Sequence, residues 1–149
     1  MEIVQLEEKM LEGISIRTMN ANEINPETAK IGSLHQRFDK TVTVDYAKGY
    51  RVYGVYYDYE SDASGEFSVL SGTDQISNPP NKDLERIKTL KGKYMVFKGK
   101  GNVPEVVIDT WSKIWSHFNN IDSEYQRAYT TDFEFYKSLT EVEIYIAIK

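Results

Sequence analysis

The feature that most constrains the fold is a repeated order of predicted elements: period-two alternation and helical spacing indicate strand, helix, strand, strand twice. The two helical segments, "NPETAKIGSLHQRF" and "VPEVVIDTWSKIWSHF", both begin near a Pro-Glu pair and end at a phenylalanine. One helix and three strands cannot easily cover both faces of a sheet, whereas two such units can pair their edges and share a core. We therefore expect a single α+β domain over residues 1–149, with duplicated β-α-β-β units at about 1–75 and 82–149.

The duplication predicts a mostly antiparallel sheet with pseudo-twofold symmetry and two main helices on one face. On the other face we expect a ligand cleft, for the reasons given below. The expected elements of the first unit are a strand at 13–19, a helix starting at Pro26 with Asn25 as its N-cap, and strands at 50–60 and 66–72. The expected elements of the second unit are a strand at 86–101, a helix after Pro104, and strands at 129–136 and 142–148.

The last two strands carry acids among residues that suit a buried sheet. In "DFEFY" and "VEIYIAI", apolar residues alternate with acids and tyrosines. If the apolar set packs under the helices, the other set shares the opposite face: Glu134, Tyr136, Glu143 and Tyr145. Such a pattern is also typical of the solvated face of an ordinary antiparallel sheet. In an aromatic-walled cleft, by contrast, a carboxylate removed from water favours a cationic ligand, and tyrosine rings add cation–π attraction.

Further aromatic candidates come from the tyrosine-rich segment 50–60 and from the second helix. Tyr53 and Tyr57 share one face of their strand, and the alternation does not decide whether this face or the other is the inner one. We include Tyr53 and Tyr57 as candidate ligand-binding residues. Trp111 and Trp115 lie four residues apart on one apolar stripe, where core packing explains at least one of them. We expect Trp115 to reach the cleft.

Charge and composition argue against several classes of function. The net charge is −5 and the lysines and arginines are scattered, which disfavours direct nucleic-acid binding. No apolar run approaches the ~20 residues that span a bilayer, and the segment "MEIVQLEEKMLEG" does not resemble a secretory signal, so we expect a cytoplasmic protein without membrane contact. There is no cysteine, and His35 and His117 lack the spacing of a helical metal pair. We expect no metal and no cofactor.

The combination of "YGVYYDYES", "GKYMVFKGKG", "DTWSKIWSHF" and "TDFEFY…VEIYIAIK" resembles the GyrI-like effector-binding domain, found in AraC-type and multidrug-responsive regulators and in stand-alone proteins. The resemblance covers nearly the whole chain and implies a cleft that binds small molecules, often lipophilic cations, around a buried glutamate. It assigns the central acid to Glu134, a second acid to Glu143, an aromatic wall position to Tyr145 and the helix aromatic to Trp115. The sequence departs from the family at Ala147 and Asn102, where relatives commonly have proline.

The sequence therefore predicts a stand-alone, noncatalytic effector-binding protein for amphipathic, aromatic or cationic molecules, without its own DNA-binding module. Two alternatives stay open. The first is a hydrolase of strained electrophilic compounds that uses paired glutamates, as some relatives do. The second is a protein-interaction module similar to gyrase inhibitors, which would act through a protein partner. Free edge strands would permit a homodimer.

Overall fold

The computed structural model describes residues 2–149, which form eight strands and three α-helices. The elements of the first half are β1 (Glu2–Leu6), β2 (Lys9–Met19), α1 (Asn20–Glu23), α2 (Ile31–Thr41), the 3₁₀ helix η1 (Tyr46–Lys48), β3 (Val52–Tyr57) and β4 (Glu66–Thr73). The elements of the second half are β5 (Glu85–Thr89), β6 (Gly92–Lys100), α3 (Glu105–Asn119), β7 (Arg127–Ser138) and β8 (Glu141–Ile148).

The strands form one sheet in the order β1-β6-β8-β7-β3-β4-β2-β5, and every neighbouring pair is antiparallel. The unit β2-α2-β3-β4 and the unit β6-α3-β7-β8 each have their third strand between the first and the second. Their strand orders are therefore mirrored about the central β7–β3 pair, as a twofold arrangement of two similar units requires. This confirms the predicted α+β fold and its mostly antiparallel sheet.

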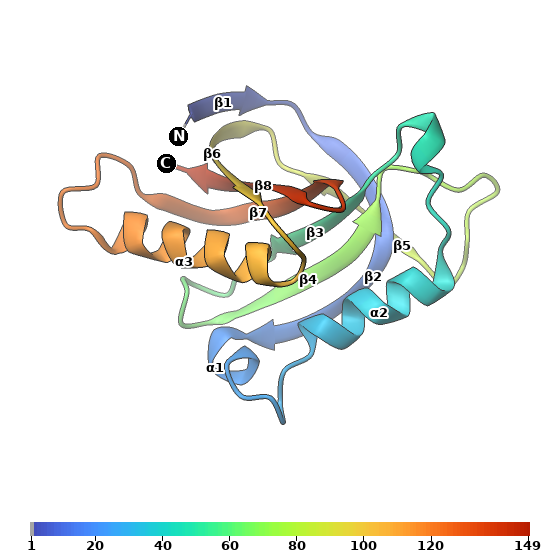
Figure 1. The fold of residues 1–149 in the computed structure, drawn as a ribbon, viewed down its shortest axis with the longest axis horizontal. Coiled ribbons are helices and arrows are strands. Elements are labelled where there is room, and N and C mark those ends of the chain that lie inside the picture. Colours follow the sequence, from blue (N-terminus) through green and yellow to red (C-terminus); the bar gives the residue numbers. More distant parts are fainter. Residues whose placement is uncertain (1) are drawn as a thin grey trace.

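The two outer strands are exchanged between the units (Figure 1). β1 precedes β2 in the chain but pairs with β6, whereas β5 precedes β6 but pairs with β2. The sequence did not predict β1, and it predicted β5 and β6 as one strand over 86–101. The structure corrects this, because β5 ends at Thr89 on one edge of the sheet, whereas β6 begins at Gly92 as the second strand from the other edge.

Both main helices lie on the same side of the sheet (Figure 1). α3 packs its buried Ile114 onto β6 and β8, in a cluster that contains Met95 and Ile144. α2 packs its buried Leu34 onto β2 and β4, in a cluster that contains Val69. The helices thus cover the two outer parts of the sheet and leave the central β7–β3 pair between them. In residues 2–149, no helix is both long and apolar enough to cross a membrane.

The start of α2 differs from the prediction. The helix begins at Ile31 rather than Pro26, and the side chain of Asn25 accepts a bond from Glu27 N in a preceding turn. The backbone amides of Lys30 and Ile31 donate instead to the carboxylate of Glu23. Because the free N–H groups at a helix start need acceptors, a glutamate several residues upstream fixes this start in place of the expected asparagine.

The face away from the helices is also largely buried. Its cluster includes Leu11, Tyr53, Tyr94 and Phe133, with Tyr145 packed against it. Side chains from the outer strands β1 and β5 join this cluster, so the curled sheet encloses part of its own second face. Apolar residues are therefore needed on both faces of the central strands.

Candidate functional site

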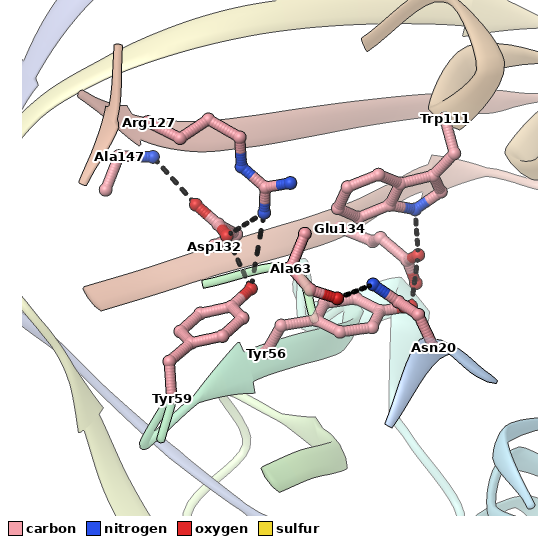
Figure 2. Close-up of polar contacts among 9 residues, drawn as sticks. All are labelled: Asn20, Tyr56, Tyr59, Ala63, Trp111, Arg127, Asp132, Glu134 and Ala147. Carbon is pink, nitrogen blue, oxygen red and sulfur yellow. Dashed lines mark hydrogen bonds and ion pairs between the residues drawn. The ribbon is translucent and has the colours of Figure 1, made fainter. Parts of the chain in front are cut away.

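Glu134 is buried on the helix-facing side of β7, at the centre of the sheet, and is only 1% exposed. The Tyr56 hydroxyl and the Trp111 indole N–H donate to its Oε2 at 2.9 Å and 2.7 Å (Figure 2). The Tyr136 hydroxyl donates to Oε1 at 2.7 Å. All three donors are uncharged, and no ion pair of Glu134 occurs within residues 2–149. The site therefore holds a carboxylate that has hydrogen bonds but no countercharge.

Gly54 makes room for this carboxylate. It lies opposite Glu134 in the β3–β7 pair, and a Cβ atom at Gly54 would come within 2.5 Å of Glu134 Oε1 and 3.3 Å of His35 Cε1. His35 belongs to α2, where its Nδ1 lies 2.7 Å from Ser71 Oγ and its ring meets Tyr136 edge-on at 6.2 Å. Side chains of both helices thus converge on the central strand pair.

We expect Gly54→Ala to lower the free energy of unfolding by about 1–3 kcal/mol, because the added methyl group overpacks the site and displaces the Glu134 carboxylate. Urea denaturation followed by tryptophan fluorescence measures this loss. Gly32→Ala is the matched control, since a Cβ atom there meets nothing within 4 Å and alanine favours the helix. Equal stability of the two variants would contradict the close contact.

The phenols around Glu134 act as hydrogen-bond donors over the whole neutral range. Burial, followed by the charge of Glu134, raises the pKa of Tyr56 and of Tyr136 well above the ordinary value for tyrosine. Both hydroxyls therefore keep their protons and donate them to the Glu134 side chain. The arrangement stabilises negative charge at Glu134 without neutralising it.

The expectation that the two terminal-strand glutamates share a face is wrong. Glu134 pairs with Ile144 across the β7–β8 hairpin, whereas Glu143 pairs with Phe135 on the face away from the helices. There the Tyr145 hydroxyl donates to Glu143 at 2.8 Å, and Lys98 Nζ lies 4.0 Å from the Glu143 carboxylate. The two acids cannot flank one bond, so the geometry contradicts a hydrolase that pairs these glutamates.

The predicted aromatic candidates are divided in the same way. Tyr136 lies beside Glu134, but Tyr53, Tyr57 and Tyr145 belong to the cluster on the opposite face. Tyr57 donates to Glu85 at 3.2 Å. The tyrosine of β3 that reaches Glu134 is Tyr56, which lies on the strand face opposite to the predicted Tyr53 and Tyr57. The ligand cleft expected on the helix-free side therefore lacks Glu134.

Trp111, rather than Trp115, contacts the central acid. The two side chains lie one turn apart on α3, and the indole N–H of Trp111 reaches Glu134. Trp115 lies over the guanidinium of Arg127, 5.5 Å from ring centroid to Cζ, and lines a cavity of about 490 Å³ at the end of α3. A second cavity of about 920 Å³ lies between α3 and β6 and is lined by Lys98 and His117, among others.

Sequence reasoning missed a second polar group on the same face. Arg127 at the start of β7 forms an ion pair with Asp132, and Tyr59 donates to the same carboxylate (Figure 2). The alternation in "DFEFY" draws attention to Glu134 rather than to Asp132, and Arg127 lies outside the quoted motifs. No group of three or more His, Cys, Asp or Glu side chains within residues 2–149 is arranged to hold a metal ion.

Comparison with known proteins identifies close similarity along the whole chain. The family described as Cass2, integron-associated effector binding protein, matches residues 2–148. The integron cassette protein VCH_CASS2, from the mobile metagenome of Vibrio cholerae, is 39% identical, with a TM-score of 0.89 and coverage of 99% of this chain and 95% of that chain. SAV2435, solved bound to tetraphenylphosphonium, is 20% identical, with a TM-score of 0.72 and coverage of 99% and 93%.

Among curated proteins, the comparison finds no match. The family match and the cassette protein from Vibrio cholerae nevertheless agree over almost every residue. The more distant SAV2435 supports the same fold. By fold and by sequence, this chain belongs to the family of integron-associated effector-binding proteins.

Proposed function

We propose that this protein binds small lipophilic cations at Glu134 and does so without catalysis. The observation that carries the proposal is the buried carboxylate with three uncharged donors and no countercharge within the described residues. A buried charge without a partner is costly, so a ligand that brings a positive charge gains the attraction that the fold leaves unused. SAV2435, which shares the fold, was solved bound to a cation of this kind.

The aromatic side chains around Glu134 complete such a site. Tyr56, Trp111 and Tyr136 each present a ring next to the carboxylate, and Tyr56 meets Trp111 edge-on at 5.2 Å. A ring face contributes about 0.5–2 kcal/mol to the binding of a cation. Ring faces and a charge demand little of the shape of the ligand, so we propose that several lipophilic cations bind here.

Binding requires movement of these rings. Glu134 is 1% exposed, and the indole of Trp111 and the phenol of Tyr56 both donate to its Oε2. A cation reaches the carboxylate when one of these donors swings away and its ring then packs against the ligand. We propose that the closed arrangement is the ligand-free state, in which hydrogen bonds from the aromatic residues stand in for the cation.

A matched pair of ligands tests the proposal. N-methyl-4-phenylpyridinium carries a fixed positive charge, whereas 4-phenylpyridine has nearly the same shape and is uncharged in mildly basic buffer. We expect the cation to bind at least about tenfold more tightly, since a hydrogen-bonded charge contributes about 1.5–3 kcal/mol. Titration calorimetry, together with quenching of tryptophan fluorescence, measures both affinities. Equal affinities, or no binding of the cation, would refute the proposal.

A further inference from the structure

Arg127 occupies an aromatic cage on the same face of the sheet as Glu134. Its Cζ lies 4.5 Å from the ring centroid of Tyr129, 5.5 Å from Trp115 and 5.9 Å from Trp111. The residue is 7% exposed. Three rings around one guanidinium are the surroundings that proteins use to bind cationic ligands. Here the cation belongs to the chain itself.

An acid completes this cage. Arg127 Nη2 donates to Asp132 Oδ2 at 2.7 Å, and the Asp132 side chain is 0% exposed. The Tyr59 hydroxyl donates to the same oxygen at 2.5 Å, and Ala147 N donates to Oδ1 at 2.9 Å. Figure 2 shows these contacts beside the Glu134 cluster. Arg127 therefore already supplies the countercharge of Asp132. The Nε of Arg127 has no hydrogen-bond partner among the described residues.

The cage and the Glu134 site share a wall. The indole N–H of Trp111 points to Glu134, while the ring of the same residue faces the guanidinium of Arg127. Asp132 and Glu134 are two residues apart in β7 and face the same side, so their Cα atoms are separated by about 7 Å. β7 thus presents two neighbouring acids to the region under the helices, one with a cation and one without.

We propose that Arg127 is a specificity-determining residue that restricts the site to ligands with a single positive charge. The inference rests on the proposed function and names the charge class of the ligand. A monocation at Glu134 leaves the Arg127–Asp132 pair intact. A dication of biaryl length would place its second charge next to the guanidinium, where like charges repel and the cage has no room for it.

The cavity next to the cage offers no other compensation for a second positive charge. Its charged lining residues, apart from Arg127, are Asp62 and Lys149, which have opposite signs. Asp62 is fully exposed, so water and salt screen its charge. Removing the guanidinium while keeping Asp132 would therefore turn the cage into a second cation site, with Trp115 and Tyr129 as its walls.

A pair of rod-shaped ligands tests this restriction. Methyl viologen has the same biaryl framework as N-methyl-4-phenylpyridinium, with a second N-methyl group and a second fixed positive charge at its far end. We expect the wild type to bind the monocation at least about tenfold more tightly than the dication. In Arg127→Met, which frees Asp132 and its cage, we expect the preference to reverse in favour of methyl viologen. Arg127→Lys keeps the charge and is expected to keep the preference for the monocation.

A double variant keeps the test decisive if Arg127→Met does not fold. Arg127→Met/Asp132→Asn removes both charges and is expected to bind the two ligands with affinities within about threefold of each other, because neither repulsion nor a second acid is left. Circular dichroism checks the fold of each variant. A wild type that binds the dication as tightly as the monocation would overturn the inference. So would an unchanged preference in folded Arg127→Met or in the folded double variant.

Failure of the proposed function gives a different result. If the monocation does not bind to the wild type, or binds without any dependence on Glu134, the proposed function fails and the inference fails with it. If the monocation binds through Glu134 but the ratio of the two affinities does not depend on Arg127, the proposed function stands and the role of Arg127 is refuted.

Discussion

Glu134→Gln is expected to weaken the binding of N-methyl-4-phenylpyridinium on the order of 100-fold, because removal of one charge from a desolvated pair costs several kcal/mol. The fold should tolerate the change. The glutamine oxygen can accept from Tyr56 and Trp111 in place of Oε2, and the hydroxyl of Tyr136 can rotate to accept from the new amide. Titration calorimetry gives the loss of affinity, and thermal unfolding shows that the structure persists.

Glu143→Gln supplies the matched control for this variant. It makes the same chemical change on the opposite face of the sheet. There Glu143 contacts Tyr145 and lies near Lys98, away from the aromatic group around Glu134. We expect its affinity for the cation to stay within about twofold of the wild type, since a partly screened charge on the other face contributes little. Similar losses in both variants, or an equal loss for uncharged 4-phenylpyridine, would show that the charge of Glu134 has no special role.

The sequence predicts the units of this fold because local signals and global topology agree in most elements. The apolar stripe of α3 and the alternation in β4, β7 and β8 each indicate one structure, and each was found close to its predicted bounds. The exchange of β1 and β5 between the units was not predictable in the same way. Strands at the edges carry weak patterns, and their partners lie far away in the sequence.

The face of the central acid could not be derived from alternation alone. Alternation places an acid on one face or the other only if a single face of the sheet, the one under the helices, is apolar. In the structure, Phe133 and Phe135 pack on the other face, where Phe133 stacks on Tyr145 at 4.7 Å. Because both faces are buried, the apolar sets of β7 and β8 lie on opposite sides, and the register of the hairpin decides which acid meets the helices.

The residues of the site differ in how strongly the sequence signals them. Glu134 was identifiable because an acid in a strand of aromatic residues needs an explanation. Gly54, alone in a tyrosine-rich strand, is a typical sign of a close approach, and this signal was available. Trp111 and Trp115 lie about one turn apart on the same stripe of α3, so their spacing does not show which of them reaches Glu134.

Asp132→Ala is expected to lower the free energy of unfolding by about 3–5 kcal/mol, the largest stability effect that we predict for this face. The variant leaves the guanidinium of Arg127 buried without its acid. Burial alone lowers the pKa of Arg127, but the charge of Asp132 and the contact with Tyr59 outweigh it, so the pKa is raised in the folded protein. Once Asp132 is removed, the guanidinium keeps its burial cost but loses its countercharge, and Tyr59 and Ala147 N also lose their acceptor.

Arg127→Met/Asp132→Asn separates the cost of an unpaired charge from the value of the pair. Replacing both partners of a buried ion pair by uncharged residues of similar size is often neutral for stability. We therefore expect the free energy of unfolding of the double variant, measured in urea, to lie within about 1 kcal/mol of that of the wild type. This holds although the double variant carries one more substitution than Asp132→Ala. If the double variant were as unstable as the single one, the pair itself would stabilise the fold. Arg127 would then be required for folding, in addition to any effect on which cations enter.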